Sequence, residues 1–209
     1  MSKPVSIGQS HNVISILANN VDWDSLDGDV LQRVINNPRE AGANFTTFLK
    51  YGARGIIVGQ KGIPINRSRA FNPAEFIGKG WTIVEQDERS LVLTEVDLTK
   101  VCFKDCLQKG ETAVNGEEKL KRLKQAGHIR LDAKIFQTLW ENQFLIPESW
   151  KEKIDGKTHF IFFDGTVFRG PNDNRYIFCL DWGGGEWWWG CLWLGDVWFV
   201  NNSSAVLTS

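Results

Sequence analysis

Tryptophan is concentrated in one stretch near the C-terminus. Residues 182–198 read WGGGEWWWGCLWLGDVW and hold six of the ten tryptophans in the chain. The residues just before, 176–182, are mostly aromatic or β-branched, as in a strand. Glycines at 183–185 then supply positions that can take positive φ, and residues 186–194 follow as a return strand. The stretch therefore predicts a tight β-hairpin in which at least one of these glycines has positive φ.

The side chains of the return strand divide between two faces, because successive residues of a strand point in opposite directions. Both faces are apolar, so either the strand is central and covered on both sides, or one face binds a ligand. In the first case the rings are core. In the second, the candidate binding residues are the six tryptophans: Trp182, Trp187, Trp188, Trp189, Trp193 and Trp198.

A further strand is expected at residues 158–169, with Gly165 at a bulge, followed by a turn at 170–174. Together with the hairpin this predicts a three-stranded antiparallel meander. We therefore expect an α+β protein with two parts. Residues 1–145 form a mixed region of helices and a hairpin, and residues 146–209 form a small antiparallel, aromatic-rich β-module.

The mixed region begins with residues 1–20, which carry few structural signals and are expected to be weakly ordered or strand-forming. Residues 24–36 predict a capped helix, and residues 81–98 predict an antiparallel hairpin around a polar turn. Residues 55–59 predict a short buried strand between glycines.

Two helices are predicted at residues 116–127 and 130–142, joined by a short link. Such a helical hairpin resembles a helix-turn-helix in outline, although the outline fits any pair of antiparallel helices. Its basic residues make nucleic-acid binding an alternative function. The expected contacts are Lys119, Lys121, Arg122, Lys124 and Arg130.

No complete catalytic constellation is visible around the three histidines, which favours a non-enzymatic protein. Carboxylates beside aromatic residues also occur where sugars are bound and cleaved, so a carboxylate-based carbohydrate hydrolase is a second alternative. Turn residues are the simpler interpretation of the same side chains. They are Asp164, Asp173, Asp181, Glu186 and Asp196.

The net charge and the cysteine spacing limit which partners and cofactors are expected. A formal net charge of −1 gives no overall attraction to nucleic acid or to an anionic membrane. The spacing of the four cysteines does not match a zinc site, and we expect reduced thiols, no metal and no cofactor. The first twenty residues lack the features of a signal peptide, and no apolar run is long enough to span a bilayer. We therefore expect a cytoplasmic protein that does not bind membranes.

The blocks LDAKIFQTLWENQFLIPESWKEK, HFIFFDGTVFR and the closing aromatic stretch, with similarity extending back to about Phe71, resemble a family of candidate-phylum bacterial proteins that share an aromatic C-terminal module. The resemblance implies a recurrent small cytosolic module and no particular activity. Our leading hypothesis is a non-catalytic protein that binds a protein or other macromolecule through its aromatic sheet surface.

Overall fold

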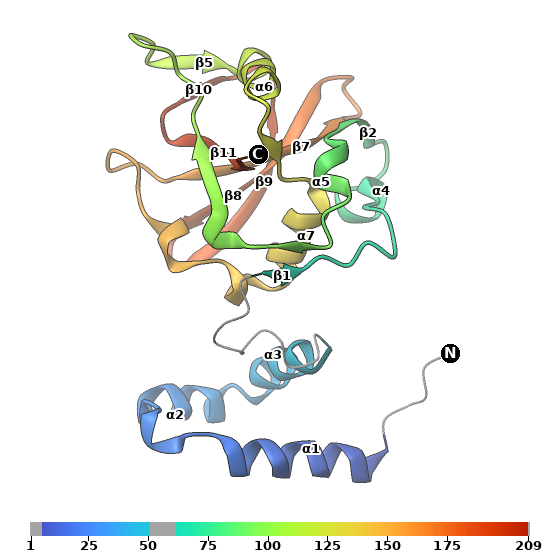
Figure 1. Ribbon diagram of the computed structural model, residues 1–209, viewed down its shortest axis with the longest axis vertical. Coiled ribbons are helices and arrows are strands. Elements are labelled where there is room, and N and C mark those ends of the chain that lie inside the picture. The colour runs from blue at the N-terminus through green and yellow to red at the C-terminus, as the bar shows by residue number, and fades with distance from the viewer. Residues whose placement is uncertain (1–5, 51–61, 209) are drawn as a thin grey trace. The chain divides into compact units, whose positions relative to one another are not determined.

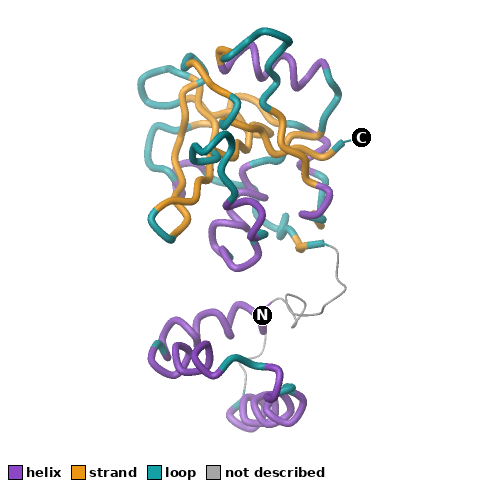
Figure 2. The backbone as a smooth tube through the Cα atoms, turned by 90° about the vertical axis from the view of Figure 1, so that its left-hand side faces the viewer, coloured by secondary structure: helices purple, strands orange, loops and turns teal. Residues whose placement is uncertain are grey.

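The computed structural model describes residues 6–50 and 62–208, and the chain divides into two compact units, residues 1–52 and 53–209. The first unit contains helices and loops, whereas the second combines helices with strands (Figures 1 and 2). The predicted boundary at 145/146 is wrong, because strands on both sides of it pair with one another in the second unit.

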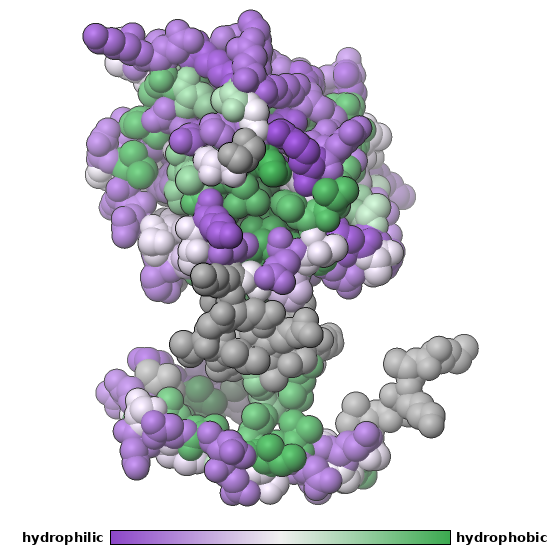
Figure 3. Space-filling model, viewed as in Figure 1, coloured by the Kyte–Doolittle hydropathy of each residue, from purple (hydrophilic) through white to green (hydrophobic). Residues whose placement is uncertain are grey.

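The N-terminal unit consists of α1 (Ile7–Asn20), a 3₁₀ turn (Trp23–Ser25), α2 (Gly28–Asn36) and α3 (Pro38–Lys50). The expectation of a weakly ordered or strand-forming lead is wrong, because a capping box starts α1. The Ser6 hydroxyl accepts from Gln9 N at 3.2 Å, and the Gln9 side chain accepts from Ser6 N at 2.9 Å. None of the residues of α1 is buried, and apolar side chains show on the surface of this unit (Figure 3).

The second unit is built on a mixed sheet, which has seven strands among the described residues. The path runs β4-β11-β7-β8-β9, β2 pairs with β7, and β6 pairs with β11; only β11 and β7 run parallel. The strands are β2 (Thr82–Gln86), β4 (Val101–Lys104), β6 (Ile129–Arg130), β7 (Phe160–Arg169), β8 (Arg175–Gly183), β9 (Glu186–Trp193) and β11 (Asn202–Leu207).

Among the described residues, two short ribbons and four α-helices complete this unit. The ribbons pair β1 (Ile63–Pro64) with β3 (Glu95–Val96) and β5 (Ala113–Asn115) with β10 (Val197–Phe199). The helices are α4 (Pro73–Phe76), α5 (Glu88–Leu91), α6 (Gly116–Gln125) and α7 (Ala133–Glu141). Short 3₁₀ turns span Leu98–Lys100, Gln143–Leu145 and Glu148–Lys151. The α+β class is confirmed, with a larger sheet than the expected meander.

The predicted hairpin at residues 81–98 does not form. Asp87 caps α5 instead, its Oδ1 accepting from Arg89 N at 3.2 Å, so the chain turns into a helix after β2. β2 pairs with β7, and β3 pairs with β1. The predicted strand at 55–59 lies outside the described residues.

The predicted helical hairpin is also wrong, because β6 lies between α6 and α7 and joins the sheet. The two helices pack against opposite faces. Leu120 of α6 packs with Phe162, whereas Phe136 of α7 packs with Phe163, the next residue of β7, which points the other way. A helix-turn-helix arrangement is therefore absent from this pair.

The meander β7-β8-β9 is confirmed with its two predicted irregularities. The β7–β8 register shifts between Phe163 and Phe168, so the bulge includes Gly165. The hairpin between β8 and β9 is closed by Gly184 and Gly185, which have φ of 64° and 90°. Two consecutive residues at positive φ define a type I′ turn, whose backbone twist matches the right-handed twist of the flanking strands. This explains why glycines occupy both positions.

Candidate functional site

Four of the six clustered tryptophans pack inward. Trp187 and Trp198 are each only 4% exposed, but they belong to different cores on opposite faces of the sheet. Trp189 is half-buried against Phe178 and α7. Trp182 packs edge-on against Trp187 at 5.4 Å between ring centroids. These rings contribute to the stability of the sheet rather than to one continuous binding face.

Trp188 and Trp193 are the exposed members, at 54% and 42%. They lie five positions apart on β9 and therefore face opposite sides of the sheet. The Trp188 indole Nε1 donates to Gly183 O at 3.1 Å, which holds the ring in place beside the hairpin. An exposed ring with a fixed orientation is a preorganised contact surface, because little side-chain entropy remains to be lost on binding.

Asp181 lies directly beside Trp188. Strand register pairs Asp181 with Trp188 on one side and with Phe160 on the other, so the three side chains form a row across β7, β8 and β9. Directly paired residues in such a row have Cβ atoms about 5 Å apart. The Asp181 carboxylate is half-buried and has no hydrogen bond or ion pair with any described residue, and burial raises its pKa above the usual range.

The next row of the same face leaves space beside this carboxylate. Gly190 pairs with Cys179, and a Cβ placed on Gly190 would meet only the Cys179 Sγ, at 3.7 Å. Leu120 of α6 and Trp198 of β10 belong to the hydrophobic cluster on this face of the sheet, and Phe160 packs against that cluster. We refer to Phe160, Asp181, Trp188 and Gly190 together as the Trp188 shelf.

The shelf has the chemistry of a cation site. A carboxylate without a partner lies next to an exposed indole ring, and both attract a positively charged group. Glu186, one residue after the hairpin glycines, is exposed and adds a second negative charge nearby. The predicted carboxylates Asp173 and Asp196 lie apart from it, Asp173 in the turn after β7, paired with Arg169, and Asp196 in the loop before β10.

The side chains expected to contact nucleic acid are buried or paired with carboxylates. Lys119 is fully buried, and Arg130, which is 4% exposed, donates to Glu85 at 3.1 Å. The other three form ion pairs: Lys121 with Glu118 at 3.5 Å, Arg122 with Glu111 at 2.5 Å and Lys124 with Glu85 at 2.7 Å.

A polar cluster lies beneath α6. The Lys119 ammonium donates to Asn202 O at 2.5 Å and stands 4.5 Å from the centre of the Phe162 ring. Asp164 is buried and accepts from the Ser204 hydroxyl at 2.5 Å, and burial raises its pKa. Burial lowers the pKa of Lys119 to about 8. These groups are sealed from solvent, so a substrate could reach them only after the fold opens.

His159 and Cys106 flank the same cluster. Burial and the Lys119 charge lower the pKa of His159 to about 4, and its ring packs edge-on against Phe103. Burial raises the pKa of the Cys106 thiol to about 11. The backbone of Cys106 also has a positive φ, of 62°. A thiol with this pKa is protonated near neutral pH and is a poor nucleophile.

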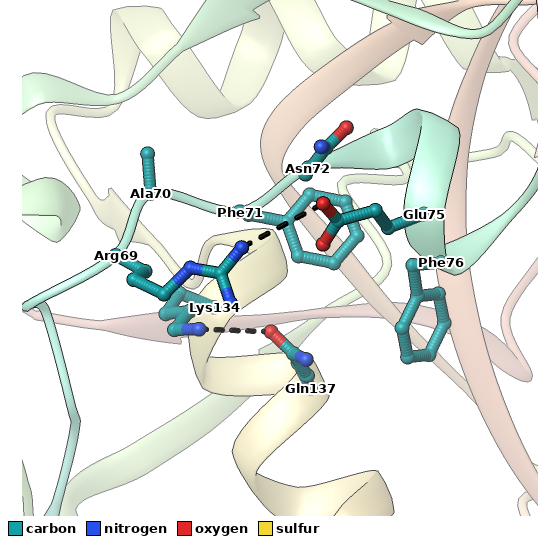
Figure 4. Close-up of a pocket in the computed structure, with 8 residues that line it drawn as sticks. All are labelled: Arg69, Ala70, Phe71, Asn72, Glu75, Phe76, Lys134 and Gln137. Atoms are coloured by element: carbon teal, nitrogen blue, oxygen red, sulfur yellow. Dashed lines mark hydrogen bonds and ion pairs between the residues drawn. The ribbon is translucent and has the colours of Figure 1, made fainter.

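A small open pocket of about 170 Å³ lies between the loop before α4 and helix α7 (Figure 4). Arg69 and Glu75 face each other across it at 3.6 Å, and Lys134 donates to Gln137 at 3.0 Å. Because its charged side chains already pair with one another, this pocket offers a ligand less unmet hydrogen-bonding capacity than the Trp188 shelf does.

Comparisons with protein-family models, curated proteins and solved structures found no match. The resemblance to the candidate-phylum family therefore stays a prediction. Within residues 6–50 and 62–208, no group of histidines, cysteines and carboxylates could hold a metal ion, and none of the helices has the length and hydropathy that crossing a membrane requires.

The sequence named Trp188 and Asp181 separately, one as an aromatic contact and the other as a candidate catalytic carboxylate. Counting outward from a two-residue Gly184–Gly185 turn pairs residue 183 with 186 and residue 181 with 188. The register of this hairpin was therefore the signal that could have joined them. Phe160 lies on β7, whose place in the meander was predicted, but the register shift between Phe163 and Phe168 hides from the sequence that Phe160 pairs with Asp181.

Proposed function

We propose that the chain is a non-catalytic binding protein whose Trp188 shelf takes up a lysine or arginine side chain of a partner protein. The observation that carries the proposal is the half-buried Asp181 carboxylate, which has no partner among the described residues and lies in register with an exposed, oriented tryptophan. A cation over the ring would gain about 0.5–1 kcal/mol at an exposed site, and its ion pair with the carboxylate would add to this.

The two alternative functions have less support. The basic residues around α6 are engaged by Glu85, Glu111 and Glu118 or are buried, which leaves few free charges for phosphate groups. For a carbohydrate hydrolase, two carboxylates must flank one substrate bond. Asp164 is buried in the interior. Of the predicted carboxylates only Glu186 lies near Asp181, and this exposed side chain has no hydrogen bond among the described residues that would fix its position.

Fluorescence anisotropy with labelled nine-residue threonine- and valine-rich peptides tests the proposal. The central residue would be lysine, arginine, norleucine or glutamate. We expect the two cationic peptides to bind at least about tenfold more tightly than the norleucine peptide, since a charge-assisted contact of about 1.5 kcal/mol corresponds to this factor. Equal binding of lysine and norleucine peptides would contradict the proposal.

Three variants test whether the peptide binds at the Trp188 shelf. Asp181→Asn and Trp188→Ala should each weaken the lysine peptide, whereas Trp193→Ala, on the opposite face of the same strand, should leave its affinity unchanged. Acidification should also weaken binding, because a protonated Asp181 no longer attracts a cation. Since the pKa of Asp181 is raised, this loss should begin at a higher pH than for an ordinary aspartate. An equal loss of peptide affinity in Trp193→Ala would show that the peptide binds elsewhere.

A further inference from the structure

The outer edge of β9 is unpaired among the described residues. β9 lies at the end of the sheet, and its only strand partner in the described chain is β8. It spans eight residues, Glu186–Trp193, without the lysine, proline or bulge that commonly protects an edge strand. Such an edge is a template for the addition of another strand.

The hairpin geometry shows which backbone groups face outward. In a two-residue turn the closing pair, Gly183 and Glu186, exchanges both hydrogen bonds, and bonded pairs then alternate along the ladder. The bond from Leu194 N to Arg175 O, at 2.9 Å, continues this even-numbered series. The N–H and C=O groups of Trp187, Trp189 and Cys191 therefore point away from β8.

We infer that β9 binds its partner by strand addition, and that the partner is an extended peptide segment with a basic side chain in register with Trp188. This inference rests on the proposed function and adds the backbone recognition that the shelf lacks. An added strand would extend the row of Phe160, Asp181 and Trp188 by one position. The peptide residue next to Trp188 in this row would lie about 10 Å from Asp181, which is two strand spacings away.

Charge and reach select the side chain at that position. The long stem of lysine or arginine can lie across the Trp188 ring and carry its charge toward Asp181, whose carboxylate has no other cation among the described residues. Glu186 adds negative charge on the same strand, whereas β9 carries no basic residue. An acidic or short side chain at this position would leave the carboxylate unpaired.

The register makes a sharp test possible on the wild-type protein. Trp188 directs its own backbone groups toward β8, so an antiparallel peptide residue opposite it also directs its N–H away from β9. Its two neighbours donate to and accept from Trp187 and Trp189. We expect backbone N-methylation of the two residues that flank the lysine to weaken binding by about tenfold or more. N-methylation of the lysine itself should leave affinity nearly unchanged.

A protein variant supplies the reciprocal test. Cys191→Pro removes one outward N–H while leaving the ladder to β8 intact, and Cys191→Ala removes the same side chain while keeping that N–H. Only the proline variant should lose affinity for the lysine peptide. The methylated peptides keep the inference testable if the proline variant does not fold.

The outcomes separate this inference from the function on which it rests. If both N-methylated peptides bind like the unmodified one, strand addition is wrong and the cation site stands. If no lysine peptide binds, the proposed function itself fails. If the chain is a dimer that Cys191→Pro converts to a monomer, a second copy occupies the edge and the peptide inference is overturned.

Discussion

Burial sets the charge of the residues beneath α6. His159 is 5% exposed, its Nε2 has no hydrogen-bond partner among the described residues, and the nearby Lys119 ammonium further disfavours its protonated form. Its pKa of about 4 lies below the usual value of 6.5. The unfolded chain therefore binds a proton more readily than the folded chain over this interval, and stability falls as the pH is lowered from about 6.5 to about 4.

Replacing His159 should remove this dependence. Between about pH 7 and about pH 5, the titration of His159 should cost the wild type on the order of 2 kcal/mol of unfolding free energy. His159→Phe, which keeps a ring against Phe103, should lose less over the same interval. Urea unfolding followed by circular dichroism measures this, with His11→Phe, at an exposed site of α1, as the control. A pH dependence unchanged in His159→Phe would show that another group is responsible.

Individual elements differ in how much of their structure the local sequence specifies. The β8–β9 hairpin and the capped helix α7 follow from nearby residues, Gly184–Gly185 in one case and Asp132 in the other, and both were predicted. β2 was predicted as a strand, but its pairing with β7 brings together residues at least eighty positions apart, which local patterns do not encode. Phe160 was left out of the predicted site for another reason, because the bulge between Phe163 and Phe168 shifts the register of a β7–β8 pairing that was itself predicted.

The hairpin turn gives a direct test at this scale. Gly184 and Gly185 have positive φ, which a β-branched residue adopts only at a cost of about 1–2 kcal/mol. Gly184→Val and Gly185→Val should each lower the unfolding free energy by about this amount. Gly183→Val is the matched control, since Gly183 does not have positive φ and its added Cβ would meet only Asp181, at 4.0 Å. Equal stability of all three variants would contradict the assigned turn.

The molecule as a whole combines a helical unit with exposed apolar side chains and a sheet unit with a small exposed aromatic surface. Its net charge of −1 conceals a local imbalance, because many cations of the sheet unit are paired with carboxylates whereas Asp181 is not. We therefore expect attraction for a basic partner to arise from one surface rather than from the total charge. At this scale the Trp188 shelf is the feature that most favours recognition of a cation.

Titration of the ¹⁵N-labelled full-length protein with the lysine peptide tests that claim most directly. Each of the ten tryptophans contributes an indole N–H resonance. The resonance that is missing from the spectrum of Trp188→Phe is that of Trp188. We predict that the Trp188 indole resonance shifts most and saturates with the anisotropy curve, while that of the buried Trp198 stays in place. Saturable binding that leaves the Trp188 resonance unmoved would contradict a cation site on this shelf.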